Sequence, residues 1–403
     1  MPFDDLFAEA QRQLNICNSC RYCAGYCPVW PALELRTELS RADVSYLASL
    51  CHDCQSCLTA CMYAPPHEFG VSPPQLFTLV RADTYRRYIW PARTIPALAG
   101  WRGLLAGFAA ACVLLAALAL LVGPGTAPGT GRLSSGSSAR SPYQLVPHLV
   151  LVIVVLIPAI STLGIMARAA WRYWQDIDGH IRGLVDLPAW ARTLWQAATL
   201  RHQTGGQEGC TYPGSDADGE PSAARRRWHH LVAYGFLLTF ASTVAAWILQ
   251  TFLHENPPYP LLSVPVLTGT IGGAAASAGC AGLIVLKRRA AQAQRTATPI
   301  VGATDTAAST LLAAAITQSA DGALLWALLA LMLTGLAVLA TRTTPLFAPA
   351  LVLHLAVVIV AFAIAPYTKF FHWVYRTLSI QHSNLEQRAV TRAALVRQRS
   401  RRR

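Results

Sequence analysis

The chain has 403 residues, of which 53% are hydrophobic and 13% are charged. An ordinary soluble domain has about 25% charged residues, so this composition excludes a wholly water-soluble protein and indicates that much of the chain lies in a lipid bilayer. The net charge of +13 would also suit a nucleic-acid-binding protein, but the distribution of the arginines described below accounts for that charge without nucleic acid.

Eight of the 11 cysteines lie near the N-terminus in two runs of one spacing, C-x2-C-x2-C-x3-C. The first run consists of Cys17, Cys20, Cys23 and Cys27 and is followed by a proline; the second consists of Cys51, Cys54, Cys57 and Cys61. This pattern is typical of proteins with two [4Fe-4S] clusters, in which the last cysteine of each run binds the other cluster. We therefore predict one cluster on Cys17, Cys20, Cys23 and Cys61, and a second on Cys51, Cys54, Cys57 and Cys27.

Two other uses of these cysteines fit less well. A structural zinc ion takes four ligands and has no role for the third evenly spaced cysteine of each run. Disulfides would require an oxidising compartment, and the first ten residues contain neither the basic nor the apolar segment of a signal peptide. We expect residues 1–90 to form a cytoplasmic two-cluster domain. The apolar residues in 32–50, between the runs, follow a period near 3.6 residues, which predicts a helical spacer.

Six later stretches are long and apolar enough to cross a bilayer, and they lie at about 103–122, 145–167, 229–253, 261–286, 323–341 and 346–366. If the N-terminus is cytoplasmic, 30 of the 33 lysines and arginines fall on the cytoplasmic side, as the positive-inside rule requires. We predict a transmembrane domain over residues 101–380 and a basic cytoplasmic tail over residues 381–403. Both termini are then cytoplasmic, and the protein is a multi-pass protein of the bacterial inner membrane.

Histidines in or beside the apolar stretches are candidate axial ligands of haem b, because ionisable side chains in a membrane are costly and usually serve a function. By depth, His148 pairs with His354, and His229 or His230 pairs with His372. These pairs would hold one or two haems stacked across the membrane. Alone, His148 and whichever of His229 and His230 is not a ligand could be an interfacial anchor, whereas His354 lies within an apolar span.

The segment from Leu353 to His372 resembles the haem-binding end of nitrate reductase gamma-type cytochromes. Together with the stretch from Arg226 to Phe236 and the two cysteine runs, it makes nearly the whole chain resemble the tricarballylate (citrate) utilization protein B family. The resemblance implies an electron-transfer subunit that receives electrons from an FAD-dependent tricarballylate dehydrogenase and delivers them to membrane quinone. The second cysteine run departs from the family pattern, because Met62 rather than proline follows Cys61.

The fold class expected is therefore mainly α: an α-helical two-[4Fe-4S] ferredoxin-like domain followed by a six-helix transmembrane haem b-type bundle. No glycine-rich turn of a flavin or nicotinamide domain is present, so the flavin and the dehydrogenase site are expected on the partner. A tricarboxylate transporter would not need eight cluster ligands, and a cluster-based redox sensor would need an output domain that the sequence lacks. Electron transfer from the clusters directly to quinone, without haem, remains an alternative within the preferred interpretation.

Overall fold

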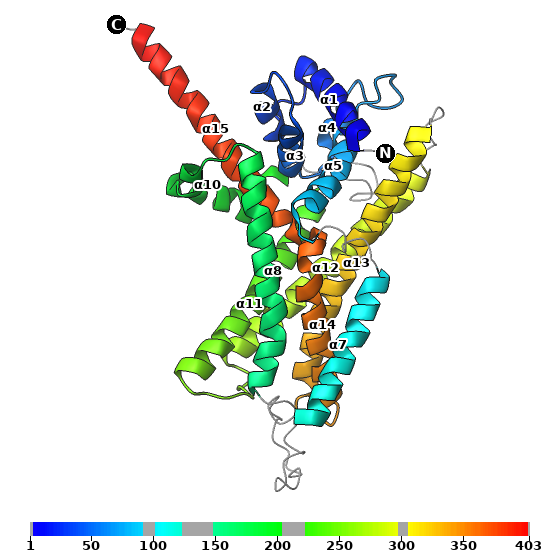
Figure 1. Ribbon diagram of the computed structural model, residues 1–403, viewed down its shortest axis with the longest axis vertical. Coiled ribbons are helices and arrows are strands. Elements are labelled where there is room, and N and C mark those ends of the chain that lie inside the picture. Colours follow the sequence, from blue (N-terminus) through cyan, green and yellow to red (C-terminus); the bar gives the residue numbers. More distant parts are fainter. Residues whose placement is uncertain (1–2, 92–100, 123–147, 204–221, 297–304, 402–403) are drawn as a thin grey trace.

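The computed structural model describes residues 3–91, 101–122, 148–203, 222–296 and 305–401. Within these ranges the regular elements are helices, and no β-strand is found. Figure 1 shows a small group of helices from the N-terminal part at one end of a long helical bundle. This arrangement confirms the predicted mainly helical fold class.

The N-terminal helices are α1 (Phe3–Cys20), α2 (Val29–Glu34), α3 (Arg41–Leu50), α4 (Ser56–Thr59) and α5 (Pro73–Tyr88). The predicted helical spacer is interrupted, because α2 ends at Glu34 and α3 begins only at Arg41. Ser40 and Asp43 form a capping box at the start of α3, in which each side chain accepts a hydrogen bond from the other residue's backbone N–H at 3.0–3.1 Å. The Ser-x-x-Asp sequence was therefore the missed signal for this break.

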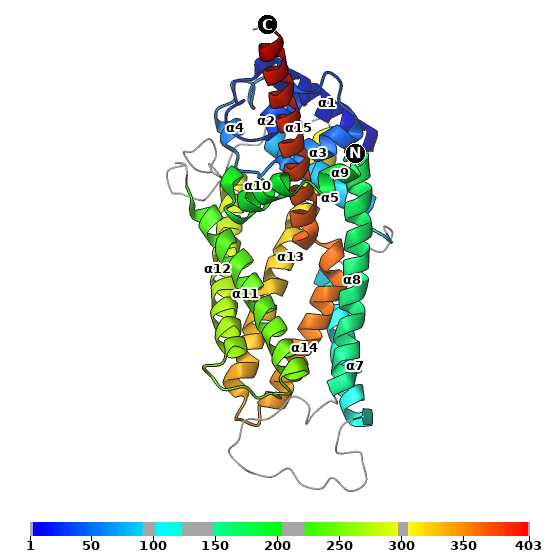
Figure 2. The same cartoon turned by 90° about the vertical axis from the view of Figure 1, so that its left-hand side faces the viewer.

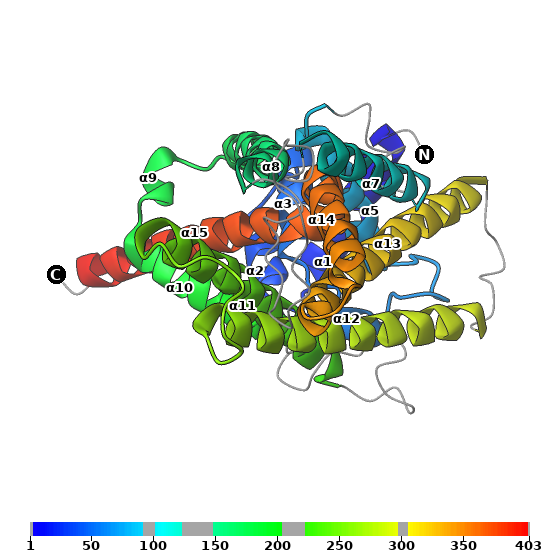
Figure 3. The ribbon, with the colours of Figure 1, turned by 90° about the horizontal axis from the view of Figure 1, so that it is seen from below.

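Six helices are long and apolar enough to cross a membrane, which confirms the number predicted from the sequence. They are α7 (Trp101–Val122), α8 (His148–Asp176), α11 (Ala224–Phe252), α12 (Val264–Thr296), α13 (Asp305–Thr341) and α14 (Phe347–Ile364). Seen along the bundle in Figure 3, α14 lies among α7, α8 and α13, and it packs against all three. Many apolar side chains on the outside of this bundle are exposed, as expected for helices whose solvent is lipid.

The closest helix pair in the bundle is α11 with α12, and glycines allow the close approach. A Cβ atom added to Gly235 would lie 2.5 Å from the backbone nitrogen of Ala276, and one added to Gly272 would lie 2.7 Å from the carbonyl oxygen of Gly235. Helices in membranes associate through such small-residue contacts, because lipid offers no hydrophobic driving force between apolar surfaces. This contact holds α11, which carries His229, in a fixed position.

Four short elements and one long helix connect the bundle to the N-terminal helices. The short elements are α9 (Ile181–Leu184), α10 (Leu187–Ala198) and the 3-10 turns η5 (Ala365–Tyr367) and η6 (Lys369–Phe371), and the long helix is α15 (His372–Arg401). In Figure 2, α15 rises from the bundle past α3, and its C-terminal end points away from the bundle. The hydroxyl groups of Tyr173 on α8 and Ser379 on α15 form a hydrogen bond with 2.6 Å between the oxygens. Tyr85 on α5 stacks on Tyr375 of α15, with 5.3 Å between the ring centroids. Helices from three parts of the sequence thus form one buried junction.

Candidate functional site

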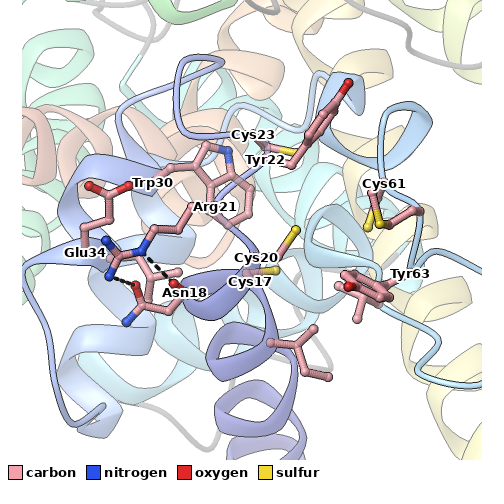
Figure 4. Close-up of a pocket in the computed structure, with 14 residues that line it drawn as sticks. Cys17, Asn18, Cys20, Arg21, Tyr22, Cys23, Trp30, Glu34, Cys61 and Tyr63 are labelled. Atoms are coloured by element: carbon pink, nitrogen blue, oxygen red, sulfur yellow. Dashed lines mark hydrogen bonds between the residues drawn. The ribbon is translucent and has the colours of Figure 1, made fainter.

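The first candidate site is a pocket at the end of α1, lined by Cys17, Cys20, Cys23 and Cys61 among other residues. Figure 4 shows Cys17 and Cys20 on the last turn of α1, with Cys61 reaching the same space from a different part of the chain. The structure therefore brings together the four cysteines predicted for the first cluster, including the one from the second run. The pocket opens to the surface, because Cys20 is exposed and Tyr22 is 64% exposed.

The second candidate site is less exposed than the first, because Cys51 and Cys54 are buried and Cys27 and Cys57 are only partly exposed. Cys51 and Cys54 are 8% and 9% exposed, and burial together with the neighbouring Cys51, Cys27 and Cys54 raises the pKa of the Cys57 thiol. The same two effects, burial first and then Cys51, raise the pKa of Cys27. The four cysteines predicted for the second cluster, Cys27, Cys51, Cys54 and Cys57, are therefore mutual neighbours.

The two sites adjoin each other. The Cys23 thiol of the first site donates a hydrogen bond to the carbonyl oxygen of Cys57 in the second site, with 3.8 Å between sulfur and oxygen. Cysteines of both runs thus contribute to both sites, as the two-cluster pattern requires.

The backbone beside the cysteines has unusual geometry. Arg21, Asp53 and Gln55 have φ values of 56°, 54° and 65°, in the left-handed region that non-glycine residues rarely adopt. All three lie next to a cysteine, and such strained residues concentrate at ligand-binding loops, where left-handed turns direct backbone N–H groups at an anion. One of these N–H groups, that of Asp53, donates to the Cys51 sulfur at 3.3 Å.

The donor set fits an iron–sulfur cluster better than a single metal ion. Within the described residues, no three His, Cys, Asp or Glu side chains lie close enough to hold one ion. Instead, the four cysteines of the first site line one open pocket. Burial and the adjacent Cys61 and Cys23 raise the pKa of Cys17 to about 12, so the Cys17 thiol would release its proton only on binding iron.

Two histidines face each other where the bundle meets the N-terminal helices. The ring centroids of His229 on α11 and His372 on α15 are 6.1 Å apart, with the ring planes at 85°. With metal–nitrogen bonds of about 2.0–2.1 Å, an iron ion between two imidazoles also places the ring centroids roughly 6 Å apart. His229 Nδ1 is buried without a hydrogen-bond partner in the described structure. The ring spacing fits an axial pair, whereas the unsatisfied nitrogen does not single out His229, because His230 Nε2 is also buried without a partner in the described structure.

The hydrogen bond of His372 prepares it for metal binding. Its Nδ1–H donates to the carbonyl oxygen of Lys369 at 2.6 Å, which leaves Nε2 with a free lone pair. Metal-binding histidines typically donate their other N–H to a carbonyl in this way. Burial, together with the nearby Arg376 and His229, lowers the pKa of His372 to about 3, so the imidazole is neutral at physiological pH.

The remaining predicted histidines separate into three cases. His230 does not belong to the facing pair, and its ring instead lies 5.6 Å from that of Tyr234. His148 is the first residue of α8, and its side chain lies outside the described residues. His354 on α14 packs against Gly335 and donates from Nδ1 to the Thr334 hydroxyl at 3.0 Å, because that hydroxyl donates its own hydrogen to the Ala330 carbonyl. The Nε2 lone pair of His354 is therefore free, as in His372.

Three arginines that the sequence did not single out converge on the loop carrying Cys51. Arg81 on α5 donates to the carbonyl oxygen of Cys51 at 3.2 Å, and Arg376 on α15 donates to the same oxygen at 2.5 Å. Arg225 on α11 donates to the carbonyl of Asp53 and lies 3.6 Å from its carboxylate. These contacts fix the second cysteine site to the bundle helix α11 and to α15.

The positions of two of these arginines mirror those of the histidine pair. Arg225 precedes His229 by four residues on α11, and Arg376 follows His372 by four residues on α15. Four residues are about one helical turn, so each helix presents a histidine to the pair and an arginine to the cysteine loop. A basic residue one turn from each candidate ligand was the available sequence signal.

Comparison with known proteins agrees with this geometry. The family model described as the citrate utilization protein B Fer4-like domain matches residues 10–87, and the citrate utilization protein B model matches residues 98–319 and 304–394. The chain belongs to the citrate utilization protein B family. A curated member from Escherichia coli, citrate utilization protein B, is 35% identical over 382 residues, which cover 94% of this chain and 93% of the relative.

No solved structure matches the chain. Membership of the citrate utilization protein B family, with a Fer4-like N-terminal domain, indicates an iron–sulfur protein, and the six apolar helices indicate a multi-pass membrane protein. The recognition of the family from the sequence is thereby confirmed.

Proposed function

We propose that the chain is a membrane electron-transfer subunit, which carries electrons from the reduced flavin of a tricarballylate or citrate-like dehydrogenase to membrane quinone. The observation that supports this most strongly is the order of the three sites. The first cysteine site opens to the surface, the second is buried behind it, and the second is joined through Arg225 and Arg376 to the helices bearing His229 and His372. A protein partner can reach one end of this series, and lipid-soluble quinone the other.

When bound, two [4Fe-4S] clusters and haem b would supply one-electron redox chemistry, which matches a two-electron flavin donor to the quinone. The two sets of four cysteines would hold the clusters, with Cys61 and Cys27 exchanged between the runs. His229 and His372 would hold haem at the inner end of the bundle. His354 is the candidate ligand of a second haem, with His148 as its proposed partner.

The chain's other residues position these groups and exclude water. Burial of Cys51 and Cys54 keeps solvent from the second site, and the tyrosines at the junction fill the space between α5, α8 and α15. We assign residues 1–90 to the cluster domain, 101–380 to the membrane domain and 381–403 to a basic tail. The chain itself would bind no tricarboxylate, so it would have no dehydrogenase activity without its partner.

The proposed orientation places the cluster domain and both termini in the cytoplasm of a bacterial cell, with the bundle in the inner membrane. The support is the distribution of 30 basic residues on that side against three on the other. An alkaline phosphatase fusion at position 129 should be active and one at position 206 inactive. The reverse pattern would place the cysteine sites outside the cell.

Reconstitution tests the function directly. Full-length protein in quinone-containing vesicles should accept electrons from a separately purified flavoprotein dehydrogenase and its substrate, with the haem absorption band reduced before quinol appears. Cys61→Ser should abolish this reduction while the haem stays reducible by dithionite. An unchanged rate of quinol formation in Cys61→Ser would show that the first cysteine site is not on the route.

A further inference from the structure

We propose that Arg81, Arg225 and Arg376 raise the reduction potential of the cluster that the second cysteine site would hold. This would allow a cluster in the exposed first site to reduce a cluster in the less accessible second site. This inference rests on the proposed function and names residues that act on the potential rather than on binding alone. It follows from the charge and burial of the three guanidinium groups at the Cys51 loop.

Burial alone would make the second site the harder one to reduce. A thiolate-bound iron–sulfur cluster is anionic, and reduction adds one more negative charge. Water stabilises that charge at an exposed site, but Cys51 and Cys54 are almost inaccessible to solvent. Without a compensating positive charge, an electron entering at the exposed first site would have to move energetically uphill to continue.

The three arginines place an excess of positive charge at this point. In the described part of the chain, neither Arg81 nor Arg376 has a carboxylate within salt-bridge distance, and Asp53 pairs with Arg225 at 3.6 Å. Burial and the neighbouring Arg81 lower the pKa of Arg376 to about 10, which still leaves it protonated at neutral pH. Buried cations of this kind require an anion nearby, and the second cysteine site, with its thiolates ionised, is adjacent.

Among the residues that the structure describes, no such group of arginines contacts the first site. Arg21 follows Cys20 directly, but its guanidinium group donates to the backbone carbonyl of Asn18 at 2.7 Å and is exposed. Its charge is therefore screened by water. The same cysteine pattern thus has solvent around one site and protein cations around the other.

The arginines would make the onward step favourable without forming or breaking a bond. One electron would leave a cluster in the first site, oxidising it, and would reduce a cluster in the second site; the reduced flavin of the partner would then supply the first cluster with another electron. Arg81, Arg225 and Arg376 stabilise the added charge and stay protonated throughout. No proton or further reactant is needed.

The test is an equilibrium redox titration of the purified full-length holoprotein, followed by electron paramagnetic resonance, without dehydrogenase or quinone. Cys20→Ser assigns the signal of the first site. Arg376→Gln keeps a hydrogen-bond donor for the Cys51 carbonyl but removes the charge, so it should shift the second signal to a more negative potential and leave the first in place. Arg376→Lys should restore the wild-type potential, and Arg21→Gln should shift neither signal.

If Arg376→Gln does not retain its cluster, Arg225→Gln decides, because the Arg225 side chain is 21% exposed and its loss removes a charge from the same loop. Three results would each overturn the inference. The decisive variant could show wild-type potentials, Arg376→Gln and Arg376→Lys could shift the potential of the second site's signal equally, or the signals of both sites could shift together. These outcomes are independent of the proposed function, whose failure would appear as absent transfer from dehydrogenase to quinone with the potentials unchanged.

Discussion

The two cysteine sites have the same spacing in the sequence but opposite surroundings in the structure. The first is open, with exposed Cys20 and Tyr22 at its mouth, whereas the second contains the buried Cys51 and Cys54. The loop of the second site also accepts hydrogen bonds from Arg81, Arg225 and Arg376. The cysteine pattern therefore predicts which residues can bind a cluster, whereas distant parts of the chain determine the solvent exposure and the charge around each site. The difference suits an entry point and an internal relay, respectively.

The largest expected effect concerns the exchange of one cysteine between the two runs. Cys61→Ser should remove the signal of the site formed by Cys17, Cys20 and Cys23, and Cys27→Ser should remove the other signal. Each variant should lose about half of the bound iron and sulfide. Iron analysis and electron paramagnetic resonance measure both effects, with Cys112→Ser as a control. Loss of the opposite signal in each case would mean that each run binds its own cluster.

The second prediction separates two adjacent histidines at the inner end of the bundle. His229→Ala and His372→Ala should each remove the inner haem, because each deletes one of two axial ligands. His230→Ala, the matched control on the next residue, should keep it. A pyridine haemochrome assay measures haem, and iron–sulfide analysis should show intact clusters. Equal haem loss from His230→Ala would contradict the facing pair in the structure.

A smaller effect is expected at His354, which lies on α14 and is not part of the inner histidine pair. His354→Ala should lower the haem content, whereas Thr334→Val should only weaken haem retention, because it removes an oriented hydrogen bond while the ligand remains. Loss of a hydrogen bond that orients a metal-binding histidine typically reduces metal affinity about 10- to 100-fold. Haem loss during dilution in detergent provides the measurement. Full haem content in His354→Ala would leave one haem, held by the inner pair.

The smallest predicted effect concerns how the cluster domain is held on α15. Glu386 accepts hydrogen bonds from Arg36 and from Tyr46, both at 2.8 Å. Glu386→Gln should lower the opening free energy of α3 amides by about 2 kcal/mol, because hydrogen bonds to a charged group are lost. Hydrogen exchange measures this energy, with the exposed Glu38→Gln as a control that should change little. Equal protection in both variants would show that this contact does not hold the domain.

The same contact should depend on pH. Burial alone would raise the pKa of Glu386, but hydrogen bonding from His382 and the charge of Arg36 outweigh it, so the pKa lies below its ordinary value of 4.5. The unfolded carboxyl group therefore binds a proton more readily than the folded one. The stabilisation is fully present above about pH 4.5 and is lost as the pH falls through the lower folded pKa.

The sequence was sufficient for the features that depend on local pattern. The six spans follow from uninterrupted apolar runs, and the grouping of the cysteines follows from their spacing. It was not sufficient to choose between His229 and His230, because that choice depends on how α11 is rotated against α15. Nor could it assign Arg81 to the Cys51 loop, since a contact across 30 residues leaves no periodic signal.

Helix α15 carries His372, Arg376 and Glu386 along one unbroken axis. At about 1.5 Å per residue, the first two lie about 6 Å apart along that axis and the outer two about 21 Å apart. A continuous helix leaves no hinge between the membrane site and the cluster domain. Internal electron transfer should therefore be insensitive to solvent viscosity, unlike transfer by a carrier domain that swings between two positions. Inserting one alanine after Trp373 would turn Arg376 and Glu386 by about 100° around the helix axis relative to His372. The insertion would break the contact of Arg376 with the Cys51 carbonyl and those of Glu386 with Arg36 and Tyr46.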